Sequence, residues 1–228
     1  MQTHLELELD ELKQKLLTMA SHAETSVKEA VAALITRDDE LALKVRQNDD
    51  VLDNFEMAVD DFAIKLLSKA PLASDLRFVT VAMKISQNLE RVGDEATKIA
   101  KRARDLNCEA PLKTNLDFAA MANVTSAMLK AALDAFVNRN SSDARAVIAR
   151  DPEVNTFNKQ ARRELEQLMM ASPENVLRAL NLMVAAKCLE RIADHATNVA
   201  EEVVYLCEAQ DIRHAAKNLP PAPAAAID

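Results

Sequence analysis

The chain has 228 residues, enough for one large domain or two small ones, with a single Gly and few aromatic residues. This composition favours helices and argues against a β-rich fold, which needs Gly and Pro turns at short intervals. The net charge of −8 argues against a nucleic-acid partner, and three Cys without Cys-x-x-Cys spacing indicate a reducing compartment and no zinc site of that type.

No segment of the sequence predicts a membrane span or a signal peptide. The N-terminal stretch MQTHLELELDELK is acidic and has no apolar core. No apolar run approaches the roughly 20 residues that a membrane helix needs. We therefore expect a cytoplasmic protein.

Apolar residues recur at three- and four-residue steps along the first half of the chain. They predict three long helices, at residues 3–35, 38–69 and 74–107. Thr36 is expected to cap the second helix and Ser74 the third. Ala70-Pro71 is expected to end the second helix, because Pro has no amide hydrogen to continue it.

The pattern restarts after a short linker that contains Pro111. It predicts helices at residues 113–138, 141–150, from 151 onward, and 173–211. Asp151-Pro152 and Ser172-Pro173 are start signals, because Asp or Ser can cap a helix and Pro fits its first turn.

The sequence repeats itself, and its most similar stretches are LERVGDEATKIA at residues 89–100 and LERIADHATNVA at residues 189–200. Between the second helices an offset of 102 also matches Arg37 to Arg139 and Phe55 to Phe157. A repeat of this length indicates duplicated supersecondary units. We therefore predict an all-α fold of two tandem three-helix-bundle repeats packed side by side, at residues 1–108 and 112–212, with a disordered tail at residues 213–228.

The repeated stretch carries a pair of acidic residues in each half. Glu90 and Asp94 are four residues apart, as are Glu190 and Asp194, so each pair lies on one helical face. Like charges at this spacing repel, and a multivalent cation would relieve the repulsion, since carboxylates suit hard metal ions.

The second helices add further donors. Asp49 and Asp53 are also four residues apart, and their repeat partners are Asp151 and Asn155. Antiparallel packing predicts two candidate metal sites, Asp49, Asp53, Glu90 and Asp94 in the first repeat, and Asp151, Asn155, Glu190 and Asp194 in the second. Because Asn is a neutral ligand, we expect the second site to be weaker or differently filled.

Other interpretations of these residues stay open. The acidic pairs are also what a solvated helix face contains, and the chain would then be a structural scaffold. The clusters could instead serve a metal-dependent hydrolase or oxidase, although the Glu-x-x-His spacing of di-iron bundles is absent. We expect His195 to be a surface or hydrogen-bonding residue rather than a ligand. Gly93, inside a helix, would let another backbone come close, or is a neutral change from the Ala at the matched position 193.

Three stretches resemble the signature of the PhoU family, the accessory protein of the bacterial phosphate-specific transport system. They are the segments 88–94, 189–201 and 70–77. The resemblance covers about residues 5–210 and includes both repeats. It implies a cytoplasmic, often dimeric protein built from two three-helix repeats.

The family resemblance also implies a function and a set of ligands. It implies a negative regulator of phosphate uptake and of the phosphate-starvation response. Such a protein links the ATPase side of the phosphate ABC transporter to a sensor histidine kinase, without a catalytic step, and reaches the membrane only through these partners. It implies metal on the Glu/Asp-x-x-x-Asp motifs, with iron, Mn, Mg, Zn or Ca as candidates. Asn155 departs from the family pattern.

Overall fold

The computed structural model describes residues 4–69 and 72–213, and over these residues every regular element is a helix. The elements are α1 (His4–Thr36), α2 (Asp39–Gln47), α3 (Asp49–Leu67), α4 (Ala73–Asn107), α5 (Phe118–Asn138), α6 (Ser141–Ile148), α7 (Asp151–Ala171), η1 (Pro173–Asn175) and α8 (Val176–Glu208). The predicted all-α class is confirmed. Within the described ranges, no helix has the length and apolar character to cross a membrane.

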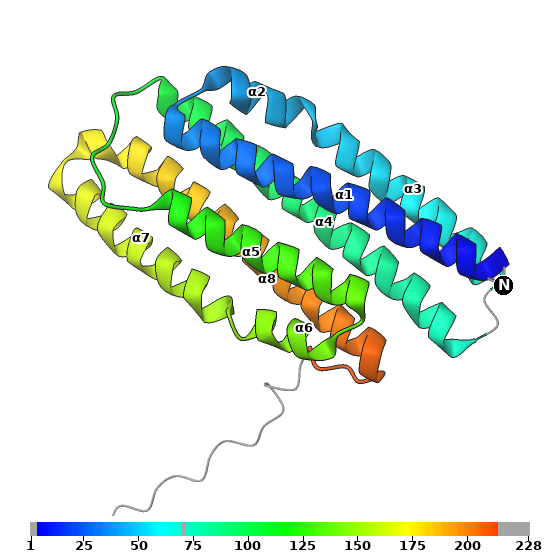
Figure 1. Cartoon of the computed structure of the whole chain (residues 1–228). Helices are drawn as coiled ribbons and strands as arrows, with labels where there is room; N and C mark the ends of the chain where they lie inside the picture. The colour runs from blue at the N-terminus through cyan, green and yellow to red at the C-terminus, as the bar shows by residue number, and fades with distance from the viewer. Residues whose placement is uncertain (1–3, 70–71, 214–228) are drawn as a thin grey trace, which may run out of the picture.

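The four long helices α1, α4, α5 and α8 pack together, and the shorter pairs α2–α3 and α6–α7 flank them (Figure 1). The helices α4 and α8 make the most extensive contact between the halves, and α1 also packs against α5. Apolar residues from both halves form one continuous buried core, from Leu12 on α1 to Leu206 on α8. The two repeats therefore lie side by side, as the sequence predicts.

The prediction of a single helix over residues 38–69 is wrong. The structure has two helices there, α2 and α3, and Asn48 separates them. The Asn48 amide donates to the carbonyls of Lys44 and Val45 and ends α2. Asp49 and Asp50 then begin α3, where negative charge is favourable at the positive end of the helix dipole. The same break occurs in the second repeat at Arg150, which is the repeat partner of Asn48.

Three predicted caps are also wrong, and one of them is Asp151, which is the first residue of α7 and follows its N-cap Arg150. Thr36 belongs to α1, and its hydroxyl donates back to the Ala32 carbonyl at 2.8 Å. Asp38 caps α2 instead, accepting from the Leu41 amide at 2.9 Å. Helix α4 begins one residue before Ser74, after an N-cap residue that makes no side-chain hydrogen bond.

The linker between the repeats is longer than predicted. Helix α5 begins at Phe118 rather than at residue 113, because Asp117 caps it by accepting from the Ala120 amide at 2.8 Å. At the other end of the second repeat, α8 stops before residue 211, since Ala209 takes a left-handed conformation with φ of 57°. The predicted break at Ala70-Pro71 and the tail from residue 214 lie outside the described residues.

Gly93 is a point of close approach, as expected, but to a side chain rather than to a backbone. A Cβ atom at Gly93 would lie 2.3 Å from Cδ1 of Leu52, on α3. The repeat partners of this pair are Val154 and Ala193, both buried. The first repeat therefore packs a large side chain on Gly where the second packs a smaller one on Ala.

Candidate functional site

The first candidate site brings α3 and α4 together along one face of the first repeat. The Thr97 hydroxyl donates to the Asp49 carboxylate at 3.1 Å, which places the start of α3 beside the middle of α4. Burial raises the pKa of Asp49, and the nearby carboxylates of Asp94 and Asp53 raise it further, against the hydrogen bond from Thr97. Asp49, Asp53 and Asp94 are thus brought together as predicted.

Glu90 joins this group, and so do two residues of α3 that the sequence interpretation missed, Glu56 and Asp60. Burial raises the pKa of Glu90, with further contributions from Asp94, Glu56 and Asp53. Burial also raises the pKa of Glu56, and Asp60 adds to this effect. The two extra acids follow Asp49 and Asp53 on the same face of α3, at steps of three and four residues. That continued spacing was the signal that could have identified them.

A basic side chain lies over this acidic cluster. Arg91 makes ion pairs with Glu90 at 3.3 Å and with Asp94 at 3.4 Å, and its own side chain is 55% exposed. Lys98 approaches Asp94 at 4.0 Å. Solvent-facing cations therefore compensate part of the cluster's charge, and partial burial together with the neighbouring acids still raises the pKa of Asp49 and Glu90.

The second candidate site has the same helices but a different set of contacts. Asn155 donates to the Asp151 carboxylate at 2.5 Å. The hydroxyl of Thr197, the repeat partner of Thr97, is buried and has no hydrogen-bond partner among the described residues. Asn155 therefore takes the place at the acid that the threonine holds in the first repeat.

Lysine also changes the charge of the second site. Lys187 forms an ion pair with Glu190, where the first repeat has the neutral Gln87. Burial raises the pKa of Asp194, and Glu190 and Asp151 raise it further. Asp151, Glu190 and Asp194 are therefore close enough to interact, but fewer acids surround them.

Polar side chains connect the two sites across the contact between α4 and α8. Glu95 is 94% buried and accepts from Lys98 at 2.9 Å and from Arg191 at 3.3 Å. Beside it, burial and the Glu95 carboxylate raise the pKa of the Cys188 thiol to about 12. His195, the repeat partner of Glu95, lies 3.0 Å from Oδ1 of Asn88, and burial lowers its pKa. His195 is thus a hydrogen-bonding residue, as expected.

The donors of the first site suit a hard cation in type, because carboxylate oxygens are the ligands that such ions prefer. Across residues 4–69 and 72–213, however, no three His, Cys, Asp or Glu side chains are arranged so that they could hold a metal ion. A cation would need the exposed Arg91 side chain to move away and the carboxylates to turn inward. The donor atoms of the first site therefore suit a hard cation chemically, but they are not already arranged in a coordination geometry.

Near the start of α8, large apolar side chains face solvent. They are Val176, Leu177, Leu180 and Val184. Their repeat partners on α4 are Leu76, Arg77, Thr80 and Lys84, so three of the four positions are polar in the first repeat. Grouped exposed apolar side chains of this kind mark surfaces that bind other molecules. We call these four α8 residues the α8 patch.

Comparison with known proteins agrees with this two-part architecture. The family model for the PhoU domain matches twice, at residues 16–103 and 118–203. The phosphate-specific transport system accessory protein PhoU homolog of Pseudomonas aeruginosa is 39% identical over 210 residues, covering 91% of this chain and 86% of that protein. The corresponding homolog of Clostridium acetobutylicum is 34% identical and covers 91% and 95%.

Two crystal structures have the same fold. PhoU from Pseudomonas aeruginosa superposes with a TM-score of 0.88 at 37% identity, covering 91% of this chain and all of that one. The phosphate transport system regulatory protein PhoU from Streptococcus pneumoniae superposes with a TM-score of 0.86 at 28% identity, covering 92% and 99%.

Proposed function

This chain belongs to the PhoU family, and from that membership we propose that it is an accessory protein of a phosphate-specific transport system. In this role it represses phosphate uptake and the phosphate-starvation response when phosphate is plentiful. The observation that carries the proposal is the match of both repeats over nine-tenths of the chain to proteins that bear this name. We further propose a cytoplasmic location, with access to the membrane only through partners.

The finer form of the proposal is a non-catalytic adaptor. The chain would contact the ATPase side of the phosphate ABC transporter and a sensor histidine kinase, and favour the kinase state that does not signal. A bound protein can shift such an equilibrium only by having different affinities for the two states. The α8 patch supports an adaptor role, because it offers a group of exposed apolar side chains to a partner.

The cellular role is tested by deleting the gene in its own organism and measuring a phosphate-starvation promoter in phosphate-rich medium. We expect the promoter to become active in the deletion strain and to be repressed again by the wild-type chain. A promoter that stays silent in the deletion strain would contradict the regulatory role. A hydrolase or oxidase activity of the purified chain that depends on Glu90 would favour the enzyme alternative.

The adaptor role is tested by binding assays with the purified transporter ATPase and with the kinase sensing region. A variant with Leu177→Arg and Leu180→Thr gives the α8 patch the residues of the first repeat. We expect it to lose binding to at least one partner. The matched control, Met57→Lys with Ile64→Glu, replaces exposed apolar residues of α3 by their second-repeat partners and should bind normally.

We also propose that the first acidic cluster, and not the second, binds a multivalent cation. Burial and neighbouring acids raise carboxyl pKa values in both clusters, and a cation would relieve that repulsion. The observation that favours the first cluster is its larger number of acids, since Asn155, Asn158 and Arg162 replace Asp53, Glu56 and Asp60 in the second. Asp49, Asp53, Glu90 and Asp94 would hold it, and Glu56 would add charge. The cation would neutralise this face and allow it to approach an anionic partner surface.

A further inference from the structure

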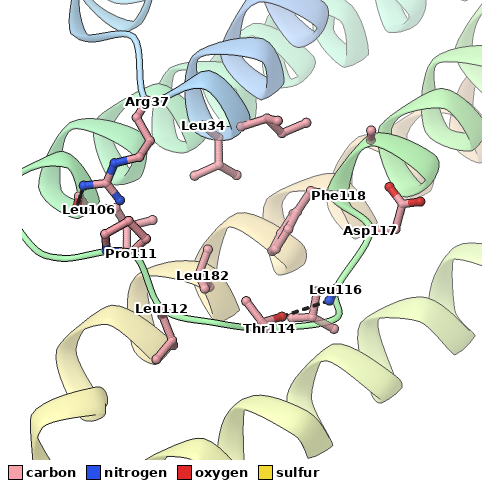
Figure 2. A pocket seen from close by; sticks show the side chains of 12 residues that line it. Leu34, Arg37, Leu106, Pro111, Leu112, Thr114, Leu116, Asp117, Phe118 and Leu182 are labelled. Carbon is pink, nitrogen blue, oxygen red and sulfur yellow. Dashed lines mark hydrogen bonds between the residues drawn. The ribbon is translucent and has the colours of Figure 1, made fainter.

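A pocket of about 300 Å³ lies where the two repeats join, beneath the linker that follows α4 (Figure 2). Its walls are mostly apolar and come from the ends of α1 and α4, the linker, and the starts of α5 and α8. Leu34, Leu112, Phe118 and Leu182 are among its apolar lining residues, and Arg37 lies at one side (Figure 2). The volume is at the lower end of the range for small-molecule sites.

The linker is fixed over the pocket by polar contacts from both repeats. The Arg37 guanidinium donates to the carbonyls of Leu106 at 2.9 Å and Glu109 at 2.6 Å. The Arg178 guanidinium donates to the Ala110 carbonyl at 3.0 Å. Further along, the Asn115 amide donates to the Glu164 carboxylate at 2.7 Å. These contacts hold the linker in place and oppose its collapse into the space below.

The repeat shows what fills the equivalent space at the opposite end of the molecule. There Phe78 stacks on Phe136, with ring centroids 5.7 Å apart and an angle of 16° between the rings. The guanidinium of Arg139 lies over the Phe78 ring, 5.5 Å from its centroid. Arg139 is the repeat partner of Arg37, and both have the same left-handed backbone conformation, with φ of 48° and 58°.

Neither aromatic ring has a counterpart at the pocket. The partner of Phe136 is Leu34, and the partner of Phe78 is Arg178, whose side chain goes to the linker carbonyl instead. The rest of the arrangement is retained, since Arg37 lines the pocket where Arg139 faces a ring. The pocket, which Phe118 lines from α5, is therefore a place where the first copy of a shared arrangement lacks the ring that lies against the arginine in the second.

We propose that this pocket binds an aromatic side chain presented by a partner protein, with the ring against Leu34 and the face of the Arg37 guanidinium. Aromatic side chains are the commonest anchors of protein interfaces, and a cation over a ring adds attraction. The proposal goes beyond the regulatory role by naming what the partner inserts. The proposal rests on the proposed function only in assuming that a partner protein exists. Binding of a ring to the pocket is measured on the chain alone, so it can fail or succeed independently of the regulatory role.

Methyl NMR spectra of the full chain test the proposal directly, with N-acetyl-phenylalaninamide as the probe and N-acetyl-leucinamide as the apolar control. We expect saturable shifts of the methyl groups of Leu34, Leu112 and Leu182, and about threefold weaker binding of the leucine probe. No saturable shift, or equal affinity for the two probes, would overturn the proposal. If toluene binds in the pocket and N-acetyl-phenylalaninamide does not, the pocket admits only free small molecules. That result would overturn the claim that the ring belongs to a partner protein.

Two neighbouring substitutions separate pocket binding from nonspecific binding. Ala119 lines the pocket and is exposed, whereas Ala120 is exposed and does not line it. Ala119→Trp should therefore abolish the shifts without disturbing the core, and Ala120→Trp should leave them unchanged. Binding that survives Ala119→Trp would show that the ring binds elsewhere.

Discussion

The two repeats place the same carboxylate motif on matching helices but surround it with different charge. At four matched positions on the motif-facing side of these helices, α3 has four acids, whereas α7 has one acid, two amides and one base. The matched positions are Asp49, Asp53, Glu56 and Asp60 in the first, and Asp151, Asn155, Asn158 and Arg162 in the second. The duplication has therefore kept the position of the motif but not the electrostatics around it.

The packing beneath the motif has diverged in a different way. The same buried position is filled by a large and a small side chain in the first repeat, Leu52 against Gly93. In the second repeat the two side chains are closer in size, Val154 against Ala193. Because interiors are close-packed, a larger side chain on one helix needs a smaller one on its neighbour. At this position the two repeats differ by a compensated pair, whereas the charged surface around the motif differs without compensation.

The largest expected effect comes from breaking this compensation. Gly93→Ala should lower the free energy of unfolding by about 1–2 kcal/mol, because its Cβ would clash with Leu52, against a gain of about 1 kcal/mol in helix propensity. Adding Leu52→Val recreates the pair of the second repeat and should restore most of the loss. Urea unfolding of both single variants and the double variant measures the coupling. Additive effects would show that the two residues do not share this space.

A smaller effect should distinguish the two motif glutamates. Glu90→Gln should raise the free energy of unfolding at pH 7 by about 0.5 kcal/mol, because it removes a half-buried charge that other carboxylates repel. Glu190→Gln should change it by less than about 0.3 kcal/mol, since the lost ion pair with Lys187 offsets the relief. The measurement is urea unfolding in the presence of a chelator. An equal gain from both substitutions would contradict the difference between the sites.

The gain from Glu90→Gln should also depend on pH. The pKa of Glu90 in the folded chain is raised above its ordinary value of 4.5. At pH values between the unfolded and the folded pKa, the folded wild-type chain therefore binds more protons at this group than the unfolded chain does. Wild-type stability from this group therefore falls as pH rises through the window above 4.5, and is regained as pH is lowered. The advantage of Glu90→Gln should accordingly shrink between pH 7 and pH 4. A gain that is constant over this range would contradict the raised pKa.

Much of the fold could be predicted from the sequence, because apolar periodicity and the repeat fix which faces are buried. The break at Asn48 was missed, although the predicted break at Asp151 lies at the matched position and could have been transferred to the first repeat. The unwound linker before Phe118 could not be predicted in this way. It depends on side chains distant in sequence, such as Arg178 and Glu164, that bind its backbone.

The candidate site was predictable in its residues but not in its contacts. The four-residue spacing identified Glu90 and Asp94, and the same spacing extended along α3 would have added Glu56. The roles of the basic residues could not be derived, since the matched arginines act differently. Arg91 binds its own motif, whereas Arg191 reaches across to Glu95 on the other repeat. Such choices depend on tertiary packing.

The most direct test of the inequality between the repeats is a calorimetric titration of the metal-free full chain with Mn²⁺. Asp49→Asn with Asp94→Asn disables the first cluster, and Asp151→Asn with Asp194→Asn is the matched change in the second. We predict that the first double variant weakens Mn²⁺ binding at least about tenfold and that the second changes it less than about twofold. Equal weakening by the two variants, or a wild-type chain that binds no Mn²⁺, would contradict a cation site confined to the first repeat.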